Sequence, residues 1–235
     1  MKKYIIGLFA CSMLLGNINA QVSTQDNQLS AKEKAQGWQL LFDGKSLEGW
    51  HGYRKSKAEG WVVKDGELTC LQEGKLQRGD LVTNQIFSDF ELVFDWKIAP
   101  GHNSGLIYRC TEDNGASYES GPEYQLIDDV GYPEKLSPGQ YSGANYDMDP
   151  PVGGKLVRAD TYNHSKIVIS NNKVEHWLNG VKVAAYEFHS PSWNEHKAKS
   201  KWSGLKTYGA SAEGYIALQD HGGGVTFKNV KIKRL

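Results

Sequence analysis

Polar side chains that could bind and cleave a carbohydrate recur at alternate positions of strand-like segments in this 235-residue chain. Because alternate side chains of a strand point to one face, Glu123 and Gln125 share a face, and so do Gln219 and His221. The same alternation predicts that Arg109 shares a face with Ile107. A solvated convex face remains an alternative for each residue taken singly, because polar residues are mostly exposed. Together they predict a set that hydrogen-bonds a polyhydroxylated ligand.

The run from Glu123 to Asp128 resembles a degenerate Glu-x-Asp-x-x-Glu signature of sandwich-fold endoglucanases. That signature supplies two carboxyl groups about 5–5.5 Å apart in a retaining enzyme. Here Gln125 replaces the central Asp, and Asp128 has a shorter side chain than Glu. Asp128 also reaches the face of Glu123 only if a bulge shifts the register by one residue. The pattern therefore does not favour a standard retaining glycosidase.

The elements that would position these residues are short strands. Apolar residues alternate with polar ones in many segments, and two of these form a hairpin around an Asp65-Gly66 turn. Helical signals are weak, and a turn or a short helix is expected only at residues 43–47 and 190–197. This pattern predicts an all-β fold, a sandwich or jelly roll. The predicted strands lie within residues 61–70, 90–98, 106–109, 123–128, 166–170, 174–178, 182–186, 215–219 and 225–232.

The segment 129–163 is long, polar and rich in Gly, Pro, Tyr and Asp. Long connections in compact domains are usually functional, so we expect loops that rim a binding face. The chain carries 27 basic and 27 acidic residues without a basic stripe, which argues against nucleic acid as a partner. Cys70 and Cys110 fall on apolar strand positions, and we favour two buried free thiols over a disulfide.

The amino-terminal segment has the pattern of a secretory signal peptide over residues 1–20, with Lys2 and Lys3 before a short apolar run. A periplasmic or secreted location follows, with lipidation at Cys11 as an alternative. Residues 21–36 are polar and aperiodic, which predicts a flexible tether. Residues 37–235 then form a single β-sandwich domain, and no further apolar run is long enough to span a bilayer.

Several motifs occur in the order typical of the 3-keto-disaccharide hydrolase family, and the chain resembles this family from about Gly37 to Leu235. One departure is that residues 159–163 replace the Gly-Glu-Trp-Asn block of many members and keep only its Asn, Asn163. The matching blocks are Leu41-Phe42-Asp43-Gly44-Lys45-Ser46-Leu47-Glu48-Gly49-Trp50, Asn103-Ser104-Gly105-Leu106-Ile107-Tyr108-Arg109, Glu123-Tyr124-Gln125-Leu126-Ile127-Asp128, His176-Trp177-Leu178-Asn179-Gly180, Leu218-Gln219-Asp220-His221-Gly222 and Phe227-Lys228-Asn229-Val230-Lys231-Ile232.

The resemblance implies a concanavalin A-like jelly-roll sandwich of two antiparallel sheets. It also implies cleavage of the glycosidic bond of sugars already oxidised at C3, such as 3-keto glycosides and disaccharides. A separate sugar 3-oxidoreductase would supply that substrate. Asn163, the retained residue of the divergent block, is a substrate-binding candidate on the same ground.

A ketone at C3 would acidify the C2 proton, and the resulting enolate could expel the group at C1. Such an elimination needs a base, an acid and a stabiliser of the enolate. Glu123 and His221 are the candidates for acid and base, in an order that the sequence leaves open, and Arg109 is the candidate stabiliser. The residues expected to bind hydroxyl groups are Asn103, Gln125 and Gln219, with His176 as a secondary candidate.

Three further interpretations remain open from the sequence. A divalent ion held by Glu123, Asp128 and His221 could polarise the ketone, although the spacing of these ligands is not diagnostic. A non-catalytic, lectin-like module would need only aromatic and amide side chains. A conventional glycoside hydrolase would act on unoxidised glycosides.

Overall fold

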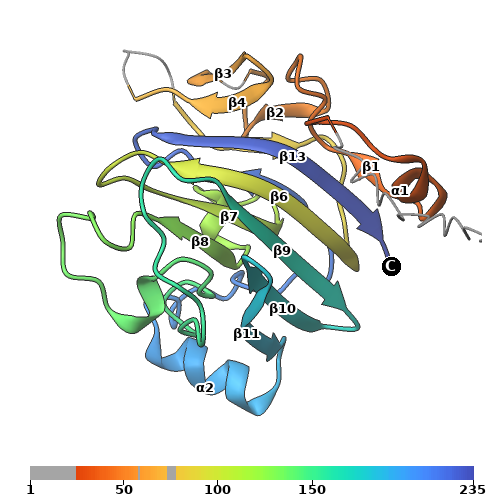
Figure 1. Ribbon diagram of the computed structural model, residues 1–235. Helices are drawn as coiled ribbons and strands as arrows, with labels where there is room; N and C mark the ends of the chain where they lie inside the picture. The colour runs from red at the N-terminus through yellow and green to blue at the C-terminus, as the bar shows by residue number, and fades with distance from the viewer. Residues whose placement is uncertain (1–24, 58, 73–77) are drawn as a thin grey trace, which may run out of the picture.

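The computed structural model describes residues 25–57, 59–72 and 78–235. The predicted signal peptide, including Cys11, and residues 21–24 lie outside these residues. Two antiparallel sheets pack face to face, which confirms the predicted all-β sandwich (Figure 1). Within the described residues no helix combines the length and the apolar character needed to cross a membrane.

The larger sheet is formed by β1 (Gln39–Leu40), β3 (Trp61–Lys64), β4 (Glu67–Cys70), β6 (Phe90–Ile98), β9 (Asn163–Ser170), β10 (Lys173–Leu178), β11 (Val181–Glu187) and β13 (Val225–Arg234). Its strand order is β11-β10-β9-β6-β13-β4-β3, and β1 also pairs with β13. The smaller sheet is formed by β2 (Trp50–Gly52), β5 (Leu81–Thr83), β7 (Asn103–Cys110), β8 (Glu123–Ile127) and β12 (Tyr215–Leu218). Its order is β2-β5-β12-β7-β8.

The helical elements are few and short. They are α1 (Ala31–Ala35), α2 (Pro191–Lys199) and two 3-10 turns, η1 (Ser117–Glu119) and η2 (Pro138–Gln140). The helix expected near residues 190–197 is confirmed as α2, which begins at the N-cap Ser190 with Pro191 in its first turn. Residues 43–47 are not helical, because Asp43 Oδ1 accepts the N–H groups of Lys45 and Ser46 and closes a turn instead.

The core lies between the two sheets and follows the predicted alternation. On β6, Phe90, Leu92, Phe94, Trp96 and Ile98 are fully buried. Phe94 meets Tyr124 of β8 edge to face, with the ring centroids 5.7 Å apart. Each such side chain contributes about 1.5–3 kcal/mol by leaving water. Because the inward face of β8 is committed to this core, its other face is available for a site.

The predicted hairpin turns occur where the sequence supplies residues that tolerate a positive φ. Asp65 and Gly66 between β3 and β4 have φ values of 52° and 80°. Asn171 and Asn172 between β9 and β10 have values of 50° and 65°. Positive φ at both central residues matches the twist of the flanking strands. The hairpin 61–70 and the β9-β10-β11 meander are therefore confirmed.

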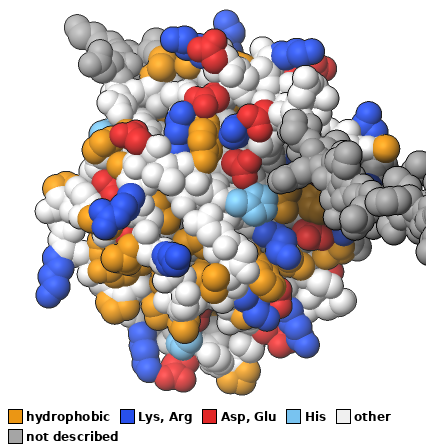
Figure 2. Space-filling model, in the orientation of Figure 1, with side chains coloured by type: hydrophobic (Ala, Val, Ile, Leu, Met, Phe, Trp, Pro, Cys, Tyr) orange, Lys and Arg blue, Asp and Glu red, His pale blue; other side chains and the backbone are white. Residues whose placement is uncertain are grey.

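The outer face of the larger sheet is covered by charged side chains of both signs. Lys97 pairs with Glu67 at 3.1 Å, and Lys233 pairs with Glu91 at 2.9 Å. Figure 2 shows acidic and basic side chains interspersed over the side of the molecule that includes β6, β9 and β13. Partly exposed pairs of this kind add little stability and keep the face hydrated. We therefore do not place a ligand site on this face.

The described part of the predicted flexible tether is hydrogen-bonded to the sandwich domain. The backbone N–H of Asn27 donates to Asn229 Oδ1 at 2.6 Å, and Asn27 Nδ2 donates to the carbonyl of Gly66 at 2.7 Å. Ser30 and Glu33 form a capping box that starts α1. Polar side chains therefore hold this segment against the domain by specific hydrogen bonds, which hydrophobic periodicity does not reveal.

The remaining differences concern short elements and the cysteines. The strands β1, β2 and β5 were not predicted, because they are two or three residues long and too short for alternation to be read. Cys70 and Cys110 are both buried and unpaired, which confirms the free thiols.

Candidate active site

A polar cavity opens on the outer face of the smaller sheet. Its first lobe has a volume of about 200 Å³ and is lined by Asn103, Tyr118, Glu123, Gln125, Tyr146, Lys201, Gln219 and His221. A second lobe of about 120 Å³ is lined by Asn103, Gln125, Ile127, Tyr132, Glu134, Lys135, Leu136, Gln140, Tyr146 and His221. The shared residues Asn103, Gln125, Tyr146 and His221 mark the boundary between the lobes.

Strand alternation brings five of the predicted site residues together in this cavity. Glu123 and Gln125 come from β8, Gln219 and His221 follow β12, and Asn103 begins β7. In the register of β7 and β8, Gly105 lies opposite Gln125, and Ile107 lies opposite Glu123. The predicted shared faces of Glu123 with Gln125 and of Gln219 with His221 are confirmed.

Glu123 is the carboxylate of the first lobe. Its side chain crosses above Gly105, so that a Cβ at that glycine would lie 2.2 Å from Glu123 Oε1. The residue is only 4% exposed. Burial raises the pKa of Glu123 to about 8, while the positive charge of Lys201 acts in the opposite direction. A buried carboxyl with a raised pKa is a candidate acid or base.

Gln125 lines the cavity and carries a buried, unsatisfied acceptor. The residue is 1% exposed, and its buried Oε1 receives no hydrogen bond from the described residues. Leaving a buried acceptor unpaired typically costs about 1–3 kcal/mol. A turn of the amide that lets a ligand hydroxyl donate to Gln125 Oε1 would recover this cost.

Gln219 and Asn103 are held by neighbouring strands and loops. The backbone N–H of Gln219 donates to the Gly105 carbonyl at 2.9 Å, and Ser104 Oγ donates to the Gln219 carbonyl at 2.8 Å. Asn103 Nδ2 donates to Tyr132 Oη at 3.3 Å. The backbone of Gln219 and the amide of Asn103 are thereby fixed, and fixed polar groups give a polar ligand a defined orientation.

His221 is positioned through the residue before it. The Asp220 carboxylate accepts two bonds from Arg78 Nε, at 2.9 and 3.1 Å, and one from Arg78 Nη2 at 2.6 Å. The backbone N–H of Asp220 donates to Asp80 Oδ1 at 2.9 Å. Asp220 therefore points inward, as its alternation predicts, and fixes the backbone from which the imidazole of His221 reaches both lobes.

The loop 129–163 supplies one wall of the cavity, as expected for a rim. Tyr132, Glu134, Gln140 and Tyr146 all come from it. Two residues of the first lobe come from elsewhere and were not predicted: Tyr118 of η1 and Lys201 after α2. Neither belongs to an alternating strand, so no periodic signal marked them. The one feature of the sequence that could have indicated Lys201 is that it stands next to Trp202, shortly after the predicted helix.

The structure corrects the prediction that Arg109 faces the ligand with Ile107. Arg109 is the extra residue of a bulge, because Tyr215 pairs with Cys110 while Ile216 pairs with Tyr108. Its φ of 53° turns the side chain out of the strand pattern. The guanidinium instead donates to Asp89 Oδ1 at 3.1 Å and lies 4.9 Å from the ring centroid of Phe188. Arg109 thus joins the two sheets and does not line the cavity.

His176 and Asn163 also lie away from the cavity. His176 is fully buried between the sheets, where Nδ1 donates to the Gly143 carbonyl at 3.0 Å and Nε2 accepts from Tyr108 Oη at 2.7 Å. Asn163 Nδ2 donates to the Thr161 carbonyl at 2.9 Å, and its Oδ1 accepts from Asn179. Both residues organise the larger sheet, and neither contacts the cavity where a ligand would bind.

Asp128 does not line the cavity together with Glu123. Its carboxylate accepts the backbone N–H groups of Gly101 at 3.0 Å and of Gly131 at 3.0 Å. Burial alone would raise the pKa of Asp128, but these hydrogen bonds outweigh it and lower the pKa. The expected ligand set of Glu123, Asp128 and His221 is therefore not assembled. Nor do other His, Cys, Asp and Glu side chains of the described residues gather in a group of three that could hold a metal ion.

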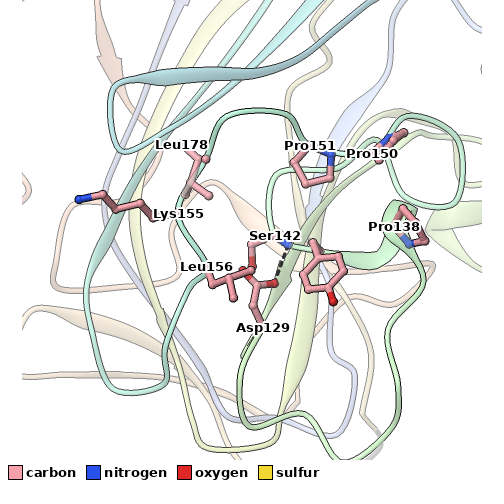
Figure 3. Close-up of a pocket in the computed structure, with 10 residues that line it drawn as sticks. Asp129, Pro138, Ser142, Pro150, Pro151, Lys155, Leu156 and Leu178 are labelled. Carbon is pink, nitrogen blue, oxygen red and sulfur yellow. Dashed lines mark hydrogen bonds between the residues drawn. The ribbon is translucent and has the colours of Figure 1, made fainter.

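A larger cavity of about 300 Å³ lies among the loops beside β10 (Figure 3). Pro150, Pro151, Leu156 and Leu178 make much of its wall. Its carboxylate, Asp129, is occupied by the backbone N–H groups of Ser142 at 2.9 Å and of Val157 at 2.7 Å. A catalytic site needs polar groups that are available to a ligand, and the Asp129 carboxylate is already occupied. We therefore place the candidate active site at the Glu123 cavity.

A comparison with known families decides the relationship. A family model described as a 3-keto-alpha-glucoside-1,2-lyase-like domain matches residues 37–233. The chain belongs to this family. The resemblance inferred from the sequence motifs is thereby confirmed. The motif blocks that contain Asn103, Glu123 and His221 are the ones that meet at the cavity.

Relatives of the chain include a 3-keto-disaccharide hydrolase from Bacteroides thetaiotaomicron. It is 32% identical over 230 residues, which cover 86% of this chain and 79% of that protein. A crystal structure from Parabacteroides distasonis, provisionally described as a glycosyl hydrolase, is 38% identical with a TM-score of 0.84 and covers 90% of this chain and 100% of that one. A second from the same organism is 27% identical with a TM-score of 0.65, covering 84% and 99%.

Proposed function

We propose that this protein cleaves the glycosidic bond of 3-keto glycosides, including 3-keto disaccharides, by removing the C2 proton and eliminating the group at C1. Family membership and the name of the Bacteroides relative support the substrate class. The buried carboxyl of Glu123 in a polar cavity, beside the unpaired amide oxygen of Gln125, is the observation that carries the proposal.

Glu123 is the base in this scheme. It lines only the first lobe, so the oxidised ring binds there with C2 near the carboxylate. Burial that raises the pKa of Glu123 makes its ionised form a stronger base, which suits abstraction of a weakly acidic C–H. Gln125, Gln219 and Asn103 bind the hydroxyl groups of the ring.

His221 is the acid that protonates the leaving oxygen. It lines both lobes, which places it at the boundary where the glycosidic bond would lie. The C1–O bond breaks as the C1–C2 double bond forms, and the leaving oxygen takes a proton from His221. Addition of water to the resulting enone gives net hydrolysis.

The second lobe fits a sugar as the leaving group. Its walls carry Glu134, Lys135 and Gln140, and Tyr132 Oη already accepts from Asn103. Such a surface hydrogen-bonds a polyol better than an aromatic aglycone. A disaccharide would thus occupy both lobes.

A conventional retaining mechanism has less support. Among the described residues, the first lobe contains one carboxylate, Glu123, while Gln125 is neutral and Asp128 is held in its own turn. The paired carboxyl groups of retaining and inverting glycosidases are therefore not found there.

The proposal extends to the setting of the reaction. The pattern of residues 1–20 supports export to the periplasm or beyond, and an upstream sugar 3-oxidoreductase would supply the substrate. Both points are expectations from the sequence and the family.

The test is a side-by-side incubation with a chromogenic β-glucoside and its 3-keto derivative, with and without a chelator. We expect chromophore release from the keto form alone, and its loss in Glu123→Gln. In deuterated water, an elimination would also place deuterium at C2 of recovered substrate or of the hydrated product.

Each other outcome has a meaning. Cleavage of the unoxidised glucoside would overturn the elimination and favour a conventional hydrolase. Binding of the keto sugar without release would favour the lectin-like module. A loss of turnover with the chelator would show that a metal ion takes part.

A further inference from the structure

Lys201 brings a positive charge to the first lobe from outside the sheets. It follows α2, and its backbone N–H donates to Asp147 Oδ2 at 2.8 Å. Its ammonium lies 4.0 Å from the ring centroid of Tyr146 and 4.3 Å from that of Trp202. Two aromatic faces therefore hold the cation at the cavity, each through an attraction of about 0.5–2 kcal/mol.

Trp202, one of the two rings that hold Lys201, is itself fixed. Trp202 is 3% exposed, and its Nε1 donates to the Tyr146 carbonyl at 3.1 Å. The indole stacks on Tyr208 with centroids 4.7 Å apart and planes 11° apart. Contacts within the protein fix this arrangement, so binding does not have to create it.

The donors of the Lys201 ammonium are available. No carboxylate among the described residues lies within ion-pair distance of its Nζ, although most lysines of the sheet faces have such a partner. Aromatic faces attract the charge but provide no strong hydrogen-bond acceptor. The N–H groups can therefore be directed at a ligand oxygen.

The other polar groups of the first lobe make Lys201 its anion-binding group. Gln125, Gln219 and Asn103 are neutral, His221 is assigned to the leaving oxygen, and Arg109 lies outside the cavity. Lysine with an unpaired ammonium matches an oxygen atom that becomes negative during a reaction.

We propose that Lys201 binds the C3 oxygen of the substrate and stabilises the enolate. This inference rests on the proposed function. Glu123 takes the C2 proton, and the electron pair moves to the C3 oxygen, where the ammonium of Lys201 balances its charge. The pair then returns to form the C1–C2 double bond as the C1–O bond breaks, and His221 gives a proton to the departing oxygen.

The test uses kojate, a planar pyranone whose ionised enol oxygen lies beside a ring ketone, as a stable mimic of the enolate. Calorimetric titration is carried out in chelator-containing buffer, at a pH where the enol is ionised, on the wild type, Lys201→Met, Lys201→Arg and Lys206→Met. Lys206 is an exposed lysine of the same loop that does not line the cavity, so its variant is the matched control.

We expect Lys201→Met to weaken kojate binding by at least about tenfold, with Lys201→Arg intermediate and Lys206→Met unchanged. With the 3-keto glycoside, Lys201→Met should lower kcat by on the order of 10²–10³ and change KM much less. A neutral sugar should bind the wild type and Lys201→Met equally.

Two results would overturn the inference: kojate that does not bind the wild type, or an affinity that Lys201→Met leaves unchanged. If kojate binding depends on Lys201 but the wild type does not cleave the 3-keto glycoside, the proposed function fails while Lys201 stands as the anion-binding group. Circular dichroism of each variant shows whether it is folded.

Discussion

The carboxylate of Glu123 lies over the backbone of Gly105, so closely that a β-carbon at Gly105 would come within 2.2 Å of Glu123 Oε1 and 2.7 Å of its Cγ. Glu123 of β8 thus occupies the space that a side chain at position 105 of β7 would otherwise fill. This gives a physical role to the glycine of the Asn103-Ser104-Gly105 motif, which is needed here for space and not for an unusual φ.

Gly105→Ala should therefore displace Glu123 from its position. Because the Cγ as well as the oxygen would clash, the whole side chain must move, and we expect kcat/KM on the 3-keto glycoside to fall by on the order of 10². Overpacking should also cost about 1–3 kcal/mol of stability. Gly204→Ala is the control, because its added Cβ meets nothing within 4 Å. Full activity in Gly105→Ala would contradict the placement of Glu123.

The pH dependence of activity should identify the role of Glu123. As a base it must be ionised, and burial raises its pKa to about 8, so kcat/KM should rise with pH through that value. Because 3-keto glycosides also eliminate spontaneously in alkali, rates without enzyme are subtracted. A rate that falls through the same pH range would assign Glu123 as the acid and His221 as the base.

The buried carboxylate of Glu123 should lower the stability of the wild type at high pH, and Glu123→Gln should remove this cost. The pKa of Glu123 is raised from its ordinary 4.5 to about 8 in the folded protein, so its contribution to stability is complete below about pH 4.5 and is lost as pH rises through 8. This shift corresponds to at most about 5 kcal/mol. Urea denaturation above the pKa should find Glu123→Gln more stable than the wild type, and the gap should close in acid.

Gln125→Leu should separate binding from stability. The substitution removes a buried oxygen that has no partner in the free protein, so stability should be unchanged or about 1 kcal/mol higher. Substrate would lose a hydrogen bond, and we expect KM to rise about tenfold or more. Thermal unfolding and steady-state kinetics of the same preparation make the comparison. A large loss of stability would show that Gln125 has a structural partner.

His176 should make the fold sensitive to acid. Burial lowers its pKa from 6.5 to about 4, so its contribution is complete above pH 6.5 and is lost as pH falls toward 4. The full loss is about 3 kcal/mol. In denaturation at several pH values, His176→Gln should lack this component while retaining the part caused by carboxylates. Identical pH profiles would rule out His176 as the titrating group.

Alternation predicted four residues of the cavity, because these lie on strands or shortly after one. Glu123 with Gln125, and Gln219 with His221, lie on the faces expected from their spacing. The prediction for Arg109 was wrong because a bulged residue moves every side chain after it to the opposite face of the sheet. No residue type in the sequence indicates where such a bulge occurs.

Other residues could not be placed from spacing. His176 has the alternation of a face residue, but that face is the interior, where a tyrosine hydroxyl and a carbonyl satisfy it. Lys201 comes from a loop whose path is set by the packing of Trp202 against Tyr208. Contacts between segments distant in sequence decide such positions, and periodicity carries no information about them.

The bulge at Arg109 divides β7 into two parts with different constraints. Before the bulge, Asn103 lines the cavity, and substitutions there should alter substrate preference while the protein still folds. Arg109 itself connects to Asp89, which directly precedes β6 of the other sheet, and substitutions there should reduce folding yield whatever the substrate. Directed evolution of specificity in this scaffold would therefore do best to randomise Asn103 and leave Gly105 and Arg109 fixed.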